Sequence, residues 1–199
     1  MKRTLTDADF LGAARRLQCK VAALRAVAAV EAPAGGFLSD GRPRVLFEGH
    51  HFHRLTEGRF AQSHPTLSYP KWTRRHYARG KDADARGAGE LARLDAAIAL
   101  DRQAALKSAS YGKFQIMGSN HRLCMYPDVE SFYMAMNIDE QKHLDAFCHF
   151  LKSRGFVVAL RELDWARFAL YNGPAFRKND YDGKLARAYA TFVGAKVVA

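Results

Sequence analysis

One stretch of the chain, residues 21–53, limits the possible folds most strongly. It contains the end of a predicted helix, followed directly by a turn that reverses the direction of the chain. Apolar residues recur there at helical spacing, as at Leu24 and Val27, and Glu31 falls on the same face. The helix must end near Glu31, because Pro33 pushes the residue before it out of the α region. The sequence therefore predicts a carboxylate on the last turn of a helix, directed towards the interior.

That position should raise the pKa of Glu31. Burial disfavours the charged carboxylate, and the negative end of the helix dipole repels it. A carboxyl group that stays protonated near neutral pH can donate the proton needed for glycosidic cleavage. A helix-end glutamate can equally turn to solvent or pair with an arginine, so its position alone does not establish a catalytic role.

A second acid, Glu48, returns towards Glu31. Gly35 and Gly36 turn the chain, and residues 37–38 and 43–47 are expected to form the two short strands of a hairpin. If the turn is centred between residues 40 and 41, Phe37 lies opposite Arg44 and Glu48 returns opposite residue 33. The two carboxylates should then lie within about 10 Å of each other. Carboxyl pairs of glycosidases are separated by about 5 to 9.5 Å.

The composition predicts one globular domain over residues 1–199. The chain has 199 residues, 48% of them hydrophobic, which is enough for a single core. No apolar run is long enough to span a membrane, and the basic N-terminus has no apolar core of a secretory signal peptide. Cys19, Cys124 and Cys148 are odd in number and scattered, so they are expected to be small core residues in a reducing compartment.

The charge predicts attraction to polyanions. The formal net charge is +11 and the isoelectric point is near 9.8. Nucleic acid, anionic cell wall and lipopolysaccharide all fit this charge. Zinc-finger spacing, basic heptads and the aromatic motif of RNA-recognition domains are absent from the sequence, so no specific nucleic-acid partner is expected.

The remaining sequence predicts mostly helices. Cap residues and apolar spacing place them from Thr6, over 90–107, from Asp128, from Asp139 to Gly155, from Asp164 to 171 and from Asp182. Residues 57–89 lack periodicity and read as a long basic, aromatic loop. Its Trp72 could stack on a sugar, with neighbouring arginines meeting carboxylates or phosphates, or could anchor a solvated loop to the core. The expected fold is mainly α, with one small β-hairpin.

His50, His51 and His53 form a close group, but their spacing matches no standard metal motif. A short surface helix with one packed histidine fits them better. Neither a metal nor an organic cofactor is expected, and activity should survive chelation by EDTA.

Several separated segments, taken in order, carry a family resemblance. AAVEAPAGGF (28–37), SASYGKFQIMG (108–118) and LYNGP (170–174) resemble the catalytic-glutamate, glycine-glutamine and tyrosine-asparagine-glycine motifs of lysozyme-like and lytic-transglycosylase domains. GFLSDGRPRVLFEGHHF and DWARFALYNGPAFRKNDYDGKLARAY make the match closer to the phage N-acetylmuramidase endolysins. The resemblance covers about residues 5–193. Each motif alone is weak, whereas the ordered set is specific.

The resemblance implies a lysozyme-like helical fold with the β-hairpin beside the catalytic cleft. The catalytic glutamate of the family falls on Glu31 and its second functional acid on Glu48, while Gln115, Tyr171 and Asn172 fall on positions that line the glycan groove. The sequence departs from the pattern twice. Ala32 stands where the family usually has serine, and Tyr111 where it usually has tryptophan. Neither departure removes a carboxylate.

The expected function is that of a peptidoglycan hydrolase, an endolysin that cleaves between N-acetylmuramic acid and N-acetylglucosamine and so lyses bacteria. Its expected partners are peptidoglycan and, through its charge, an anionic outer-membrane surface, and it should act as a monomer. It would stay in the host cytoplasm until a holin-type pore releases it to the wall. The alternatives are a lytic transglycosylase that forms 1,6-anhydro products, a non-catalytic wall-binding domain or a nucleic-acid-binding protein. Two apposed acids favour an enzyme, because a polyanion-binding cleft should exclude carboxylates.

Overall fold

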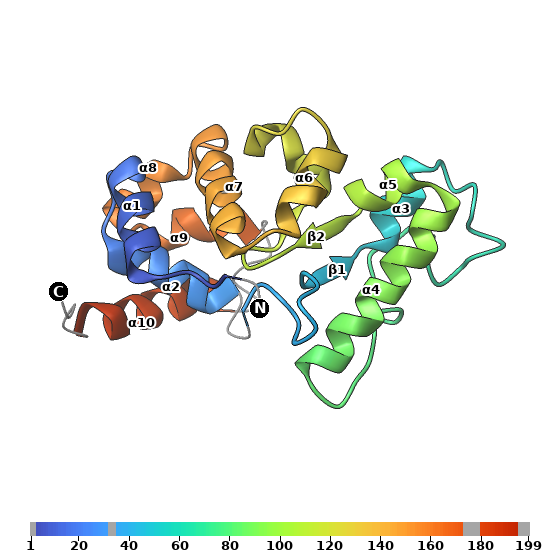
Figure 1. The fold of residues 1–199 in the computed structure, drawn as a ribbon, viewed down its shortest axis with the longest axis horizontal. Helices are drawn as coiled ribbons and strands as arrows, with labels where there is room; N and C mark the ends of the chain where they lie inside the picture. The colour runs from blue at the N-terminus through green and yellow to red at the C-terminus, as the bar shows by residue number, and fades with distance from the viewer. Residues whose placement is uncertain (1–2, 32–34, 173–179, 195–199) are drawn as a thin grey trace.

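The computed structural model describes residues 3–31, 35–172 and 180–194. Helices make up most of these residues (Figure 1). The α-helices are α1 (Asp7–Leu17), α2 (Val21–Glu31), α3 (Gly49–Leu55), α4 (Ala83–Leu100), α5 (Arg102–Lys107), α6 (Val129–Met136), α7 (Glu140–Ser153), α8 (Val157–Glu162), α9 (Trp165–Phe168) and α10 (Tyr181–Gly194). Two 3₁₀ helices are η1 (Gly118–Cys124) and η2 (Ala169–Asn172). No helix among the described residues is long and apolar enough to cross a membrane.

A small antiparallel sheet lies at the centre of the molecule. Its strands are β1 (Val45–Phe47), β2 (Ala109–Tyr111) and β3 (Ile116–Met117), in the order β1-β2-β3. Val45 pairs with Tyr111 across the first ladder, and Ser110 pairs with Met117 across the second. The expected fold class, mainly α with a small β element, is confirmed, but β1 has its ladder partner about 65 residues further along the chain.

The expected hairpin is reduced to a single bridge between Phe37 and Pro43, and its expected register was wrong by one residue. The loop has three residues, because the Leu38 N–H donates to the Arg42 carbonyl and the Gly41 N–H to the Leu38 carbonyl. Gly41 has a φ of +83°, the left-handed conformation that closes such loops. An odd loop length shifts the facing residues by one.

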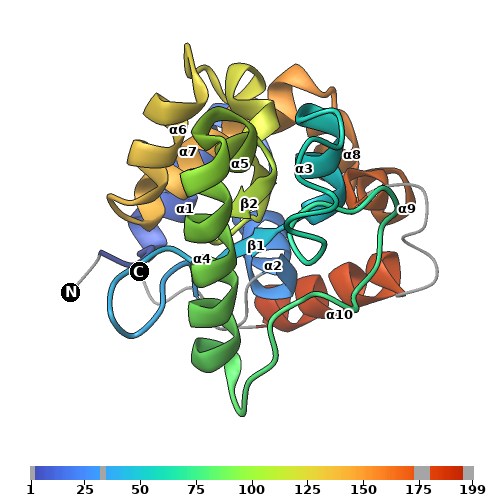
Figure 2. The ribbon, with the colours of Figure 1, turned by 90° about the vertical axis from the view of Figure 1, so that its right-hand side faces the viewer.

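The helices form two lobes on either side of the sheet (Figure 1). The large lobe contains α1, α2 and α7–α10, and the small lobe contains α3, α4, α5 and the chain between α3 and α4. Leu24 and Val27 of α2 are fully buried, and α10 packs along α2 in both views (Figures 1 and 2). The central position of α2 follows from its composition, which is apolar on nearly every side up to Glu31.

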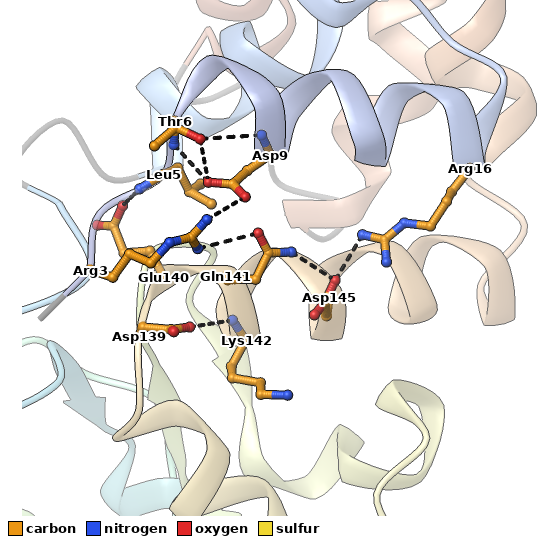
Figure 3. A network of polar contacts seen from close by, with 10 residues as sticks. All are labelled: Arg3, Leu5, Thr6, Asp9, Arg16, Asp139, Glu140, Gln141, Lys142 and Asp145. Carbon is orange, nitrogen blue, oxygen red and sulfur yellow. Dashed lines mark hydrogen bonds and ion pairs between the residues drawn. The ribbon is translucent and has the colours of Figure 1, made fainter.

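The start of the large lobe is fixed to α7 by polar contacts (Figure 3). Thr6 and Asp9 form a reciprocal capping box at the N-terminus of α1. Arg16 at the other end of α1 donates to Asp145 of α7 at 2.7 Å. The predicted helix starts at Thr6, Asp128 and Asp139 are confirmed as N-caps.

The largest difference from the predicted helices concerns α4. It begins at Ala83, capped by Asp82, and not near Glu90 as the sequence suggested. In the sequence, Gly87 and Gly89 indicate a loop, but both lie inside α4. These two helix positions need glycine because neighbouring side chains lie too close for a Cβ atom. An added Cβ would lie 2.4 Å from Leu38 Cδ2 at the first and 2.6 Å from Ala78 Cβ at the second. The predicted single helix to residue 107 also divides, because Asp101 caps α5 with its own carboxylate.

Candidate active site

A cavity of about 380 Å³ opens between the two lobes. The last residue of α2, Glu31, lies in one wall, and β1 and the first turns of α4 form the others. The residues that line it are Glu31, Gly35, Arg44, Val45, Leu46, Tyr77, Ala78, Ala83, Arg86, Gly87, Glu90 and Gln115. The cavity therefore brings together one acid from each lobe and a glutamine from the sheet.

Glu31 occupies the position that the sequence predicted, on the last turn of α2 and partly buried. Burial raises the pKa of its carboxyl group to about 7, because the charged form loses hydration. The Tyr181 hydroxyl at the start of α10 donates a hydrogen bond to Glu31 Oε1, and this bond by itself lowers the pKa of Glu31. A carboxyl group with this pKa is partly protonated at neutral pH and can act as a proton donor.

Glu48 lies between β1 and α3, where it occupies the N-cap position of the helix without capping it through its side chain. Its two carboxylate oxygens instead share the single hydroxyl proton of Tyr77, with the hydroxyl oxygen 2.8 Å and 2.9 Å away. Burial and this carboxylate raise the pKa of the Tyr77 phenol. Glu48 is not among the lining residues, but Tyr77 is, and so is Leu46, which shares a strand face with Glu48. The second acid therefore adjoins the cavity at the end of β1.

Gln115 lines the cavity from the turn between β2 and β3. Its backbone has a φ of 47°, and both ends of its amide are held. The amide nitrogen donates to the Gly112 carbonyl at 2.8 Å, and the amide oxygen accepts from the Ser110 hydroxyl at 3.0 Å. A side chain fixed in this way is suited to binding a ligand in one orientation.

Tyr171 and Asn172 are placed differently. The Tyr171 hydroxyl donates to the Phe114 carbonyl at 2.7 Å, and its ring packs against Phe147 and Phe168 in the large lobe. Tyr171 is not among the residues that line the described cavity, although Glu31 contributes to raising the pKa of its phenol, after burial. The backbone of Asn172 ends η2, while its side chain and residues 173–174 lie outside the described part of the chain.

Glu90 is the second acid that lines the cavity, and it joins β1 to the loop that carries Tyr77. One carboxylate oxygen accepts from the Phe47 N–H at 3.1 Å, and the other accepts from the Ala78 N–H at 2.6 Å. Arg93 pairs with Glu90 at 2.7 Å and donates to the Phe47 carbonyl at 3.1 Å. The residues next to Glu48 and Tyr77 in sequence are thus held by one ion pair.

A second buried acid fixes the chain just beyond Glu31. Glu140, at the start of α7, accepts from the Gly36 N–H at 2.6 Å and from the Leu5 N–H at 3.1 Å, the latter seen in Figure 3. His143 on the next turn accepts from the Lys113 N–H at 3.1 Å, close to the turn that carries Gln115. The N-terminus of α7 therefore supports two of the segments around the cavity.

The three neighbouring histidines lie on α3, where the His50 and His51 rings meet edge to face with centroids 4.5 Å apart. His53 Nδ1 lies 3.2 Å from the Ser68 hydroxyl, and His51 Nδ1 lies 2.8 Å from Arg54. His50 Nδ1 lies 3.2 Å from a Glu48 oxygen, and burial lowers the pKa of its imidazole. In the described part of the chain, no three His, Cys, Asp or Glu side chains are grouped as metal ligands. Insensitivity to chelation stays a prediction.

The two family departures can be compared with the structure. Tyr111 is fully buried, its hydroxyl donates to the Leu106 carbonyl at 2.9 Å, and its ring packs against Phe132 and Tyr133 of α6. Ala32 lies outside the described residues. The possible anchoring role of Trp72 was wrong, because 57% of this residue is exposed, whereas Leu67 and Tyr69 are buried.

The sequence did not single out Tyr77, Glu90 or Tyr181 as site residues. Tyr181 lies in the DYDGKLARAY part of the family motif, so the resemblance could have identified it as a candidate site residue. Tyr77 stands in the basic, aromatic loop, where nothing indicates which ring turns inward. Glu90 could be found only by knowing that α4 packs against β1, a contact between segments about 43 residues apart.

Comparison with known proteins agrees with this geometry. The family model described as Muramidase, N-acetylmuramidase, matches residues 20–193. Among solved structures, the crystal structure of Burkholderia AP3 phage endolysin is similar with a TM-score of 0.83 and 42% sequence identity, and the match covers 97% of this chain and 73% of that chain. No curated protein matches the chain. The chain therefore belongs to the N-acetylmuramidase family, and it is a peptidoglycan hydrolase with a lysozyme-like helical fold.

Proposed function

We propose that the protein cleaves the β-1,4 bond between N-acetylmuramic acid and N-acetylglucosamine, with Glu31 as the proton donor. The observation that carries this proposal is the Glu31 carboxyl group in the wall of the cavity, with a pKa raised to about 7. Glycosidic cleavage needs an acid that is still protonated near neutral pH, since the leaving oxygen must receive a proton as the bond breaks.

Glu48 is the second acid of this mechanism. The Tyr77 hydroxyl holds its carboxylate beside the cavity by one hydrogen bond shared between the two oxygens. A fixed negative charge there stabilises the positive charge that develops on the sugar ring, or orients a water molecule for attack. Gln115, fixed at both ends of its amide, is proposed to bind the glycan, and Tyr171 and Asn172 keep the groove-lining roles that the family resemblance gives them.

The products of purified sacculi test this proposal. After digestion and borohydride reduction, mass spectrometry should find reduced N-acetylmuramic acid at the new ends. Products dominated by 1,6-anhydro ends would assign the protein to the lytic transglycosylases. Reduced N-acetylglucosamine ends would assign cleavage to the other bond of the strand. The Glu31→Gln protein provides the control, because it should release neither product.

We also propose that release to the wall uses a holin-type pore, as the resemblance to phage endolysins suggests. Expression in a bacterial host should lyse the cells only when a holin is expressed with the protein. Lysis by the protein alone would contradict this route.

A further inference from the structure

The chain that leads into α4 carries a row of cations along one edge of the cavity. Within residues 71–86, a stretch that we call the cationic rim, six residues are basic and two are acidic: Lys71, Arg74, Arg75, Arg79, Lys81 and Arg86 against Asp82 and Asp84. Figure 2 shows this stretch descending beside α4 and turning into its first residue. Tyr77, Ala78, Ala83 and Arg86 of the same stretch line the cavity.

Both acids of the cationic rim are occupied by other contacts. Asp82 accepts from the Ala85 N–H at 2.7 Å and caps α4. Asp84 accepts from the Ser39 N–H at 3.0 Å and pairs with Arg44 at 2.6 Å. Among the described residues, therefore, no acid pairs with the exposed cations at 71, 75, 79 and 81.

The cationic rim is fixed in place relative to the cavity. The Tyr77 hydroxyl is bound to Glu48 and the Ala78 N–H to Glu90, so two acids at the cavity fix the middle of the stretch. Gly80 packs against the first turn of α4, where an added Cβ would lie 2.7 Å from Ala85 Cβ. Arg79 and Lys81 lie in sequence between Ala78 and Ala83, which line the cavity, so their positions at its edge are fixed. In the same stretch, 57% of Trp72 is exposed and the Arg74 guanidinium lies 5.7 Å from its ring.

This arrangement separates two kinds of charge. The cavity itself contains Glu31 and Glu90, with Glu48 beside it, so a polyanion such as nucleic acid would meet carboxylates on entering. A neutral sugar chain that carries acidic side branches would place its sugars in the cavity and its carboxylates at the edge. Peptidoglycan has this pattern, since acidic peptide stems branch from an uncharged glycan backbone.

We propose that the cationic rim binds the free carboxylates of the peptide stems and so favours glycan strands that carry acidic stems. The inference rests on the proposed cleavage of the glycan strand. Exposed ion pairs are individually weak, so several cations together are expected to lower KM by about five- to tenfold and to leave kcat unchanged.

The experiment compares two soluble substrates that differ only in stem charge. One consists of glycan strands with intact stems, and the other of the same strands after a carbodiimide and excess ammonia have converted the stem carboxylates to amides. kcat and KM are measured for the native protein, for the triple variant Arg75→Gln, Arg79→Gln, Lys81→Gln, and for a control triple variant. The control, Arg122→Gln, Lys152→Gln, Arg154→Gln, removes the same charge from exposed positions on η1 and at the end of α7. In Figure 1 the end of α7 lies at the top of the view and the start of α4 at the bottom.

The native protein should have a lower KM for the acidic strands than for the amidated ones. The rim variant should lose this difference, with an unchanged melting temperature and unchanged kinetics on amidated strands, while the control variant should keep it. Equal KM values of the native protein on both substrates would overturn the inference and leave the proposed function intact. The inference would also be overturned if the control variant lost as much of the KM difference as the rim variant, since net charge alone would then be responsible. Failure of the native protein to cut either substrate would instead contradict the proposed function.

Discussion

At the scale of single residues, the carboxyl group of Glu31 is held between two opposing influences. Burial at the end of α2 favours the protonated form, and the hydrogen bond from Tyr181 favours the ionised form. The balance gives a pKa of about 7, so the group can both hold and release its proton under physiological conditions. Two predictions about activity follow from this balance.

The first concerns removal of the acid. Glu31→Gln keeps the shape of the side chain but cannot protonate a leaving oxygen, so kcat should fall by at least about 10²-fold. Glu48→Gln should also lower kcat, because the charge held by Tyr77 is lost. The double variant should lose less than the product of the two single losses, since both residues are proposed to act on one transition state. Turnover of purified sacculi and circular dichroism melts of all three variants provide the measurement. A Glu31→Gln protein with full activity and the melting temperature of the native protein would contradict the mechanism.

The second concerns the hydrogen bond. Tyr181→Phe removes the donor that lowers the pKa of Glu31, so that pKa should rise and activity should persist to higher pH. The alkaline limb of the pH profile should move up by about 0.5 to 1 unit, since a hydrogen bond contributes about 0.5–1.5 kcal/mol and one unit corresponds to about 1.36 kcal/mol. Tyr189→Phe on the same helix is the matched control. A shift to lower pH, or an equal shift in the control, would contradict the assignment.

Residue positions in the site were predictable to different degrees. Glu31 could be placed from Pro33 and the apolar spacing of α2, because both act within a few residues. Its donor Tyr181 lies 150 residues away, and the Tyr77–Glu48 contact spans 29 residues. Local patterns contain no information on such contacts, which depend on how α10 and the loop before α4 pack. Only the family motif offered a route to Tyr181.

At the scale of the elements, β1 and α4 form one unit that holds the second acid. Glu90 and Arg93 of α4 bind the backbone of Phe47 on both its N–H and its carbonyl. The strand has only three residues, which is too short to fix its own position, so the helix supplies the missing contacts. The sequence misplaced the start of α4, since glycines usually weaken a helix, whereas here they permit it to approach Leu38 and Ala78.

This unit gives a prediction for Glu90→Gln. One amide oxygen cannot accept from both the Phe47 and Ala78 N–H groups, and Arg93 loses its partner. The free energy of unfolding should fall by about 2–5 kcal/mol, and kcat should fall as Glu48 loses its support. Glu130→Gln breaks the exposed pair with Arg102 and should cost only about 0–1 kcal/mol. Urea unfolding and sacculus turnover measure both effects, and similar losses in the two variants would refute the special role of Glu90.

The three histidines of α3 give a prediction about metals. Activity on sacculi should be unchanged after dialysis against EDTA, because the contacts of His51 and His53 to Arg54 and Ser68 account for their positions. The readout is the rate of turnover before and after chelation, with and without added zinc. Loss of activity in EDTA that zinc restores would show that these rings serve a metal.

At the scale of the whole molecule, the two lobes place an acid with a raised pKa in the same cavity that the cationic rim borders. The mainly helical architecture could be foreseen from caps and apolar spacing, because these signals are local. The pairing of β1 with β2, and therefore the cavity between the lobes, could not, because it depends on contacts about 65 residues apart. The acid proposed as the proton donor, Glu31, has a cost in stability, and this cost depends on pH.

The final prediction is the form of that dependence. Glu31 has a pKa of about 7 in the folded protein and 4.5 as its ordinary value, so between these pH values the folded state binds more protons than the unfolded state. Its contribution therefore lowers the free energy of unfolding as pH rises from about 4.5 to about 7, by on the order of 3 kcal/mol in full. Half-buried His51 and buried His143, whose pKa values are lowered, act in the opposite direction in part of this range. Urea unfolding from pH 4.5 to 8 should consequently show Glu31→Gln becoming more stable than the native protein as pH rises, with little difference between them at pH 4.5. A difference that does not change with pH would mean that Glu31 has an ordinary pKa, and the proton donor would then have to be sought elsewhere in the cavity.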